Sequence, residues 1–388
     1  FGSSKRCSQK LVPLPSFLCA AVNPSLGMSS VYLEHRDAFH VAGASSRAEI
    51  ERALDRVAVA LLDCDAWMVT AGAGMGVDSG MPDFRGPTGL FHDRETPMTW
   101  EETSNDKWFA EDPAFAWGMF YSRLDMYRTT IPHAGFDVLL KWATDLRKPY
   151  YIFTSNVDCQ FQTAGFPDGR VIACHGDFAC LQCVDRNCKG PNHPEDQVWS
   201  ADCIPRGLGA NGGIDGNYRF ADPTALDAPY FHCPRCGKLA RPNVWMCKDK
   251  NMVLRQSSTK KYDQFHQWKN ELQDAKAKVV VLECGGGMMI PSVRVESEDM
   301  VEYCGDGSLM VRMNPKDTKV PAEKAVGLAL GCREALELID HRLQALCCGD
   351  RRSSPLPAAR EPTVAPKVRA KAKVGGPRVK PKVAPKET

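Results

Sequence analysis

The order of apolar segments along the chain predicts an α/β fold with a Rossmann-like, mainly parallel sheet. Short apolar runs typical of strands alternate with helical patterns, and glycine or polar residues follow directly after the strand ends. A cysteine-, proline- and glycine-rich stretch at 180–240 interrupts this alternation and indicates a smaller inserted module. We therefore expect an open sheet whose ligand crevice lies at the carboxyl ends of its strands.

Hydrophobic periodicity places the individual elements. Over 46–63 the apolar side chains fall on one helix face, and Ser46 with Glu49 forms a capping box. Two helical patterns, interrupted by an Ile-Pro pair, cover 113–146. Short apolar runs predict strands at 66–71, 150–154, 171–173, 278–283 and 309–313. Further helices are expected at about 260–276 and 322–346.

Composition excludes several classes of protein. The chain has 388 residues, and its 43% hydrophobic and 25% charged residues are typical of a soluble globular protein. No apolar run approaches the roughly 18–20 residues that a membrane span requires, so no membrane partner is expected. Several of the 17 cysteines form C-x-x-C pairs in a long chain, which favours metal binding in a reducing compartment. We expect an intracellular protein, cytoplasmic or nuclear, with a mitochondrial location not excluded.

Both ends of the chain differ in composition from its centre. Residues 1–45 form a predicted extension, for which a transit peptide and an untranslated-region artefact are both open, with Met28 as an alternative start. Residues 347–388 are expected to be a disordered tail, because 351–388 contains 11 Lys and Arg against 2 Glu and no aromatic anchor. Such a basic tail suits an acidic partner such as nucleic acid, or a nuclear address, and equally a solvated segment with no partner.

A glycine-rich turn directly follows the first predicted strand. It contains Gly72, Ala73 and Gly74, and is followed by the trio Asp83-Phe84-Arg85. A strand followed by a glycine turn brings backbone N–H groups close to a dinucleotide phosphate, because a Cβ would block the approach. The turn alone is also typical of an ordinary tight loop. The trio at a fixed distance makes it a candidate site.

Two C-x-x-C pairs predict a metal site in the inserted module. They are Cys180 with Cys183 and Cys233 with Cys236. Four thiolates in two such pairs match tetrahedral zinc, and they leave no coordination position open, so the zinc is expected to be structural. Two further cysteines, Cys188 and Cys203, lie in the long spacer between the pairs, and Cys188 is the more plausible substitute ligand.

Polar residues at two other strand ends are candidates for catalysis. His175 ends the strand at 171–173, and a neutral imidazole is suited to accept a proton from a ribose hydroxyl. Asn156 and Asp158 follow the strand at 150–154, which places an amide and a carboxylate at the same sheet edge. Asn and Asp at such positions are also common turn formers.

Five linked motifs resemble those of the sirtuin family. They are, in order, GAGMGVDSGMPDFRG, TSNVD, CHGDFACLQC, CPRCGKLARPNVWM and RMNP. The resemblance covers roughly residues 48–346, and the sequence of the glycine loop is similar to that of a mainly bacterial-type branch of the family. It implies a catalytic domain over 46–346 in which a zinc module at about 177–241 is inserted.

The resemblance implies an NAD-dependent protein-lysine deacylase acting on an acyl-lysine protein or peptide. In that family the acyl oxygen attacks the nicotinamide ribose, nicotinamide leaves, and the histidine at the position of His175 acts as base while the acyl group passes to ADP-ribose. By matching position, Asn156 and Asp158 are expected to hold the nicotinamide end. The implied NAD-binding residues are Gly72, Ala73, Gly74, Asp83, Phe84, Arg85, Ser155, Asn156, Asp158, Gly285, Gly286, Gly287 and Asn314.

The chain departs from the family pattern at three places. Ser155 stands where the family often has Gln, and Gly285-Gly286-Gly287 replaces a Gly-Thr-Ser turn, which removes a hydroxyl donor near the cofactor. In the substrate-holding segment, Lys248 stands where many members have glycine, which puts peptide affinity in question.

Other functions remain open beside the deacylase. Mono-ADP-ribosyl transfer on the same fold is barely distinguished by sequence. A non-catalytic, zinc-containing chromatin or nucleic-acid binding module is a further alternative, although it has no need of His175 or of the acidic-aromatic-basic trio. A Rossmann oxidoreductase is disfavoured, because Asp158, at the end of the second strand, does not follow the glycine turn at the spacing of about 20 residues that a ribose-binding acid requires.

Overall fold

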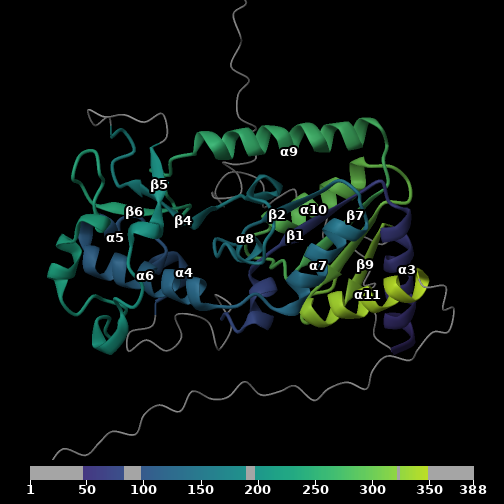
Figure 1. Cartoon of the computed structure of the whole chain (residues 1–388), viewed down its shortest axis with the longest axis horizontal. Helices are drawn as coiled ribbons and strands as arrows, with labels where there is room; N and C mark the ends of the chain where they lie inside the picture. The colour runs from purple at the N-terminus through teal and green to yellow at the C-terminus, as the bar shows by residue number, and fades with distance from the viewer. Residues whose placement is uncertain (1–46, 83–97, 189–196, 321–323, 348–388) are drawn as a thin grey trace, which may run out of the picture. The chain divides into compact units, whose positions relative to one another are not determined.

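A six-stranded parallel sheet forms the larger part of the structure, a computed structural model shown in Figure 1. The structure describes residues 47–82, 98–188, 197–320 and 324–347. In spatial order the strands are β3 (Val171–Ala173), β2 (Tyr150–Thr154), β1 (Ala66–Ala71), β7 (Val279–Cys284), β8 (Leu309–Met313) and β9 (Ala325–Leu328). Strands β1 and β7 are buried along their whole length, as expected for a parallel sheet covered on both faces.

The strand order reverses between β1 and β7. The chain begins the sheet at β1, adds β2 and β3 outward on one side, and then returns to add β7, β8 and β9 on the other. In open parallel sheets the loops on either side of such a reversal diverge and leave a ligand crevice at the carboxyl ends of the strands. The loops after β1 and β7 therefore define where the crevice lies.

Helices cover both faces of this sheet. Figure 1 shows α9 (Gln256–Asp274) and α10 (Ser292–Tyr303) on one side, and α3 (Arg47–Asp63), α7 (Ala134–Asp145) and α11 (Cys332–Cys347) on the other. Met68 and Val281 pack with residues of α9 and α10, and because side chains alternate along a strand, their sequence neighbours point to the opposite face. None of the helices that the structure describes is both long and apolar enough to cross a membrane.

A three-stranded antiparallel sheet, in the order β5-β4-β6, forms a smaller module. Its strands are β5 (Val198–Ser200), β4 (Gly176–Cys183) and β6 (Ala240–Val244). It packs with α4 (Trp100–Thr103), α5 (Trp108–Glu111) and α6 (Pro113–Thr129) around a buried aromatic cluster that includes Trp117, Phe120, Phe178 and Phe231. The short helices are η2 (Ala73–Ser79), α8 (Gln160–Thr163), η3 (Asp168–Arg170), η4 (Ala201–Cys203), η5 (Ala210–Gly212), η6 (Pro223–Asp227) and η7 (Pro229–Phe231).

Most predicted elements agree with the structure, and the closing helix at 322–346 is the main error. Its first part is strand β9, which pairs with β8, and the helix begins only at Cys332. A short apolar run fits a buried strand as well as a helix, and only its neighbour in the sheet decides. Helix α10 was also not predicted from the sequence. Ser46 of the predicted capping box, the expected extension at 1–45 and residues 348–388 of the expected tail lie outside the described residues, while Cys347 is the last residue of α11.

Candidate functional site

Four loops meet at the carboxyl edge of the large sheet. They follow β1, β2, β7 and β8 and carry Gly72, Ala73 and Gly74, then Ser155, Asn156 and Asp158, then Gly285, Gly286 and Gly287, and finally Asn314. The structure therefore brings together the residues that were expected at one site. Asp83, Phe84 and Arg85 lie outside the described residues, so their predicted role stays a prediction.

The β1 and β7 loops are in direct backbone contact. A Cβ at Gly72 would lie 2.7 Å from the carbonyl oxygen of Gly285, and one at Gly74 would lie 2.7 Å from the Gly285 Cα. The Gly74 N–H donates to the Gly285 carbonyl at 3.1 Å, and Gly285 itself has φ +62°. These glycines are thus required by the approach of two loops to each other, whereas the sequence suggested only the approach to a phosphate.

Asn156 joins the β2 loop to the β1 loop. Its Nδ2 donates to the Gly72 carbonyl at 2.9 Å, and its backbone N–H donates to the Thr154 hydroxyl at 3.0 Å. The neighbouring Asp158 accepts from the Gln160 N–H at 2.9 Å, and burial raises the pKa of its carboxyl to about 6. The site therefore holds a carboxylate that titrates close to neutral pH.

His175 is held as a neutral base. Its Nδ1 lies 3.2 Å from the Ser155 carbonyl oxygen, which can only accept, so Nδ1 carries the proton and Nε2 keeps a free lone pair. Burial lowers the pKa of His175 below its usual 6.5. Its own carbonyl accepts from the Trp245 N–H at 2.8 Å, which ties it to the end of β6.

His133 supports the site and was not predicted from the sequence. The Gly135 N–H donates to its Nδ1 at 3.0 Å, so Nε2 carries the proton and donates to the Met75 carbonyl at 2.9 Å. It is buried, and burial lowers its pKa. His133 thereby fixes the helical turn that follows the glycines. A histidine at the cap of a predicted helix, directly after the Ile-Pro pair, was the available signal.

Lys248 has a backbone conformation that favours glycine. It is exposed, and its φ is +60°, in the left-handed region. The turn around it is fixed by a buried ion pair in which the guanidinium of Arg241 contacts both carboxylate oxygens of Asp249. A lysine at this position therefore destabilises the fold through backbone strain.

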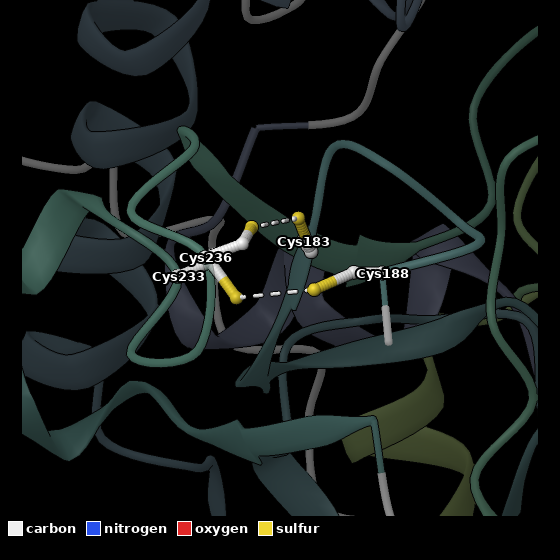
Figure 2. A group of neighbouring side chains, drawn as sticks. All are labelled: Cys183, Cys188, Cys233 and Cys236. Atoms are coloured by element: carbon white, nitrogen blue, oxygen red, sulfur yellow. Dashed lines mark hydrogen bonds between the residues drawn. The ribbon is translucent and has the colours of Figure 1, made fainter. Parts of the chain in front are cut away.

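Four cysteine side chains gather in the small module: Cys183, Cys188, Cys233 and Cys236. Figure 2 shows them pointing toward one another from the end of β4, the turn after it and the knuckle before β6. Their sulfur atoms all lie within 4.8 Å of one another, with Cys183 and Cys236 at 3.7 Å and Cys188 and Cys233 at 3.9 Å. Tetrahedral zinc with Zn–S bonds of about 2.3 Å separates its sulfurs by about 3.8 Å. The cluster therefore fits structural zinc.

The prediction of Cys180 as a ligand is wrong, and Cys188 takes its place. Cys180 lies three residues before Cys183 on the same strand, so the two side chains point to opposite faces. On its own face, Cys180 accepts a hydrogen bond from Nη1 of Arg255 at 2.7 Å. Cys188 reaches the cluster through the turn that follows β4, in which its N–H bonds to the Asp185 carbonyl at 3.0 Å. Cys203 is exposed and lies outside the cluster.

Comparison with known proteins identifies a matching family. A family model described as the Sir2 family matches residues 72–267. NAD-dependent protein deacylase 2 of Pseudomonas aeruginosa is 33% identical over 129 residues, which are 33% of this chain and 50% of that protein. A probable bifunctional ADP-ribose hydrolase/ADP-ribosyltransferase of Fusarium oxysporum f. sp. cubense is 26% identical over 250 residues, 62% of this chain and 39% of that one. The chain spans about half the length of the curated relatives it matches.

Solved structures share the fold. A crystal structure of a Sir2 homolog–NAD complex has a TM-score of 0.54 and 21% sequence identity, with 80% of this chain and 99% of that chain covered. Another, of a Sir2 homologue bound to ADP-ribose, has a TM-score of 0.52 at 21% identity and covers 76% of this chain and 98% of its own. At this identity the likeness concerns the arrangement of the elements.

Exchange of single cysteines is expected to separate the metal ligands from their neighbour. Cys188→Ser should lower the zinc content from about one ion per chain to well below half, since one of four thiolates is lost. Cys180→Ser is the matched control, because its hydroxyl still accepts from Arg255 and no ligand is removed. Elemental analysis by mass spectrometry and thermal melting measure both effects. Loss of zinc in Cys180→Ser, with retention in Cys188→Ser, would contradict the assignment.

Replacement of Lys248 by glycine is expected to stabilise the fold. Relief of the left-handed conformation should raise the free energy of unfolding by about 1 kcal/mol in urea denaturation. Lys250→Gly is the control, because Lys250 is also exposed but has no positive φ. There the added freedom of the unfolded chain should destabilise by about 0.5–1 kcal/mol. Changes of the same sign in both variants would show that strain at Lys248 has no effect on stability.

Proposed function

The chain belongs to the Sir2 family, and from this premise we propose that it is an NAD-dependent protein-lysine deacylase that transfers the acyl group to ADP-ribose and releases nicotinamide. Curated relatives named as NAD-dependent protein deacylases support the proposal. The single observation that carries it is the geometry of His175, a neutral imidazole with a free Nε2 at the carboxyl edge of the parallel sheet.

The loops at the sheet edge fit a dinucleotide. Reversal of strand order between β1 and β7 places the crevice between the loops that begin at Gly72 and Gly285, and Gly287 and Asn314 lie on the same edge. A Cβ added to Gly287 would meet nothing within 4 Å, so space for a ligand exists above this residue. When bound there, NAD supplies the ADP-ribose that accepts the acyl group, and nicotinamide is the leaving group.

His175 and Asp158 would carry the proton and charge chemistry. His175 holds its Nδ1 proton on Ser155, so only Nε2 is available to take a proton from a ribose hydroxyl. Asp158, with a pKa of about 6, is mostly ionised at neutral pH and suits the nicotinamide end, where positive charge is present. Asn156 would act beside it by holding the Gly72 carbonyl in place.

The zinc would act on structure alone. Four cysteine ligands leave no open coordination position for a substrate or a water molecule. By joining the end of β4 to the knuckle that precedes β6, the metal would hold the module in which β6 leads to Trp245 and the contact with His175. Its removal is therefore expected to affect the site indirectly.

A second candidate function is mono-ADP-ribosyl transfer to protein. The relative in Fusarium oxysporum f. sp. cubense, named as a probable ADP-ribose hydrolase/ADP-ribosyltransferase, favours it. The two reactions differ in what receives the ADP-ribosyl group. Labelled NAD distinguishes the two reactions. ADP-ribosyl transfer would leave label on protein even when no acyl-lysine peptide is added, whereas deacylation consumes NAD only when the peptide is present.

The proposed substrate is an acyl-lysine protein or peptide. An acidic partner such as nucleic acid, bound through the charge of the tail at 351–388, is a separate proposal that rests on composition. An intracellular location, cytoplasmic, nuclear or mitochondrial, is also proposed. It rests on the clustering of thiols for a metal, which needs a reducing compartment.

Loss of the base is expected to abolish deacylation. His175→Ala should lower kcat for nicotinamide release and for deacylated peptide by about 10²–10⁴-fold, while NAD still binds. His341→Ala, which removes an exposed histidine on α11, is the matched control and should retain full activity. Product formation is scored by mass spectrometry with an acetyl-lysine peptide. Equal nicotinamide release by wild type and His175→Ala would show that this residue is not the base.

Activity is expected to fall on the acid side of neutrality. His175 must be neutral, and its pKa lies below 6.5; Asp158 must be ionised, and its pKa is about 6. Both groups reach their active form as the pH rises, so kcat/KM should increase from about pH 5 to about pH 7 and then level off. The limiting slope of log kcat/KM against pH should approach about 2 in wild type and about 1 in Asp158→Asn. A rate that declines between pH 5 and 7 would contradict this assignment.

A further inference from the structure

The carbonyl group of Gly286 receives three hydrogen bonds from side chains. Arg294 donates to it through Nε at 3.2 Å and Nη2 at 2.9 Å, and Asn314 donates through Nδ2 at 3.2 Å. A carbonyl oxygen has two lone pairs, so this group is saturated and its direction is fixed. It points toward the buried guanidinium of Arg294, whose side chain is 1% exposed.

Arg294 is itself held rigidly. Its Nη2 donates to the Asp317 carbonyl at 3.2 Å and lies 3.1 Å from the Asp317 carboxylate, while Nε lies 3.9 Å from Glu283. Glu283 is in turn bound by both nitrogens of the Arg312 fork, at 2.6 and 2.8 Å. The charges of this buried network are paired, so the surrounding residues fix the orientation of the Arg294 guanidinium.

The direction of the Gly286 carbonyl determines that of the next N–H. In a trans peptide the C=O and the following N–H point in opposite directions, so the Gly287 N–H points away from Arg294. Gly286 is buried, and a Cβ there would lie 2.9 Å from the Glu283 carboxylate. Gly287 is exposed, and a Cβ there would meet nothing within 4 Å. The N–H thus points to the side of the loop opposite Arg294, where Gly287 is exposed.

We propose that Arg294 is a positioning residue that aims the Gly287 N–H at an acceptor oxygen on the ADP-ribose half of the dinucleotide. This inference rests on the proposed use of NAD. It gives the loop a fixed backbone donor where its three glycines provide no hydroxyl group. Arg294 acts through the peptide and does not touch the ligand, because its side chain is buried and its Nε and Nη2 donors are taken up by Gly286 and Asp317.

Titration calorimetry with ADP-ribose tests the role of Arg294 without any turnover. Arg294→Met should weaken ADP-ribose binding about 10-fold, the usual loss for one positioned hydrogen bond to an anionic or hydroxyl oxygen. In turnover, KM for NAD should rise by a similar factor while kcat changes less than about two-fold. Arg294→Lys, which keeps the charge and one donor nitrogen, should recover part of the affinity. A lower melting temperature with unchanged ADP-ribose affinity would overturn the proposal.

Gly287→Ala tests the same point without disturbing the buried network. The methyl group has open space and an ordinary φ, so the melting temperature should not change, but ADP-ribose affinity should fall about 10-fold because the methyl group occupies the approach to the N–H. Gly169→Ala is the matched control, because Gly169 also has open space and no positive φ and lies in η3, away from the crevice. Equal ADP-ribose affinity in Gly287→Ala and wild type would overturn the proposal, even if Arg294→Met fails to fold.

The two proposals fail in different ways. A wild-type protein that binds neither NAD nor ADP-ribose overturns both the proposed function and the role of Arg294. A wild-type protein that binds ADP-ribose but releases no nicotinamide overturns the deacylase, and leaves the affinity comparison of Gly287→Ala with Gly169→Ala to decide on Arg294.

Discussion

The backbone contact between the β1 and β7 loops is the constraint on which the candidate site depends. Gly72 and Gly74 meet Gly285 so closely that a Cβ on any of them would overlap main-chain atoms of the other loop. These loops leave neighbouring strands at the point where the strand order reverses. The contact forms the base of the crevice and fixes the position of both loops relative to the sheet edge. Asn156 extends it to the β2 loop, and Asn314 to the β8 loop.

Much of this arrangement follows from local sequence. Strands β1, β2, β3 and β8 lie where the apolar runs predict them, because a buried parallel strand is apolar on both faces and short. The polar residues after them were therefore placed on one edge correctly. The order of the strands could not be predicted, because no local sequence pattern indicates whether β7 pairs with β1 or with β3. The same limit applies to β9, whose apolar run resembles a helix until β8 is beside it.

The metal ligands show a different limit. The spacing Cys180-x-x-Cys183 has the form of a knuckle, but a knuckle needs a turn, and here the four residues are extended strand. Only the antiparallel pairing of β4 with β5 and β6 keeps them extended, and that pairing is set by residues far along the chain. The second pair, Cys233 and Cys236, was identified correctly because Gly237, at φ +71°, lies in the turn itself. His133 was missed for a similar reason, because its partner Met75 lies 58 positions away.

The position of His175 has a consequence for how the two sheets work together. Only Cys174 and His175 separate the last strand added on one side of the large sheet, β3, from the first strand of the small one, β4. The imidazole is bonded to Ser155 of the large sheet, while the carbonyl of the same residue is bonded to Trp245 of the small module. His175 therefore links the large sheet to the small module, and the orientation of its ring depends on how the two are aligned. A tilt of the small module would lengthen the bond to Ser155 and free the ring to turn.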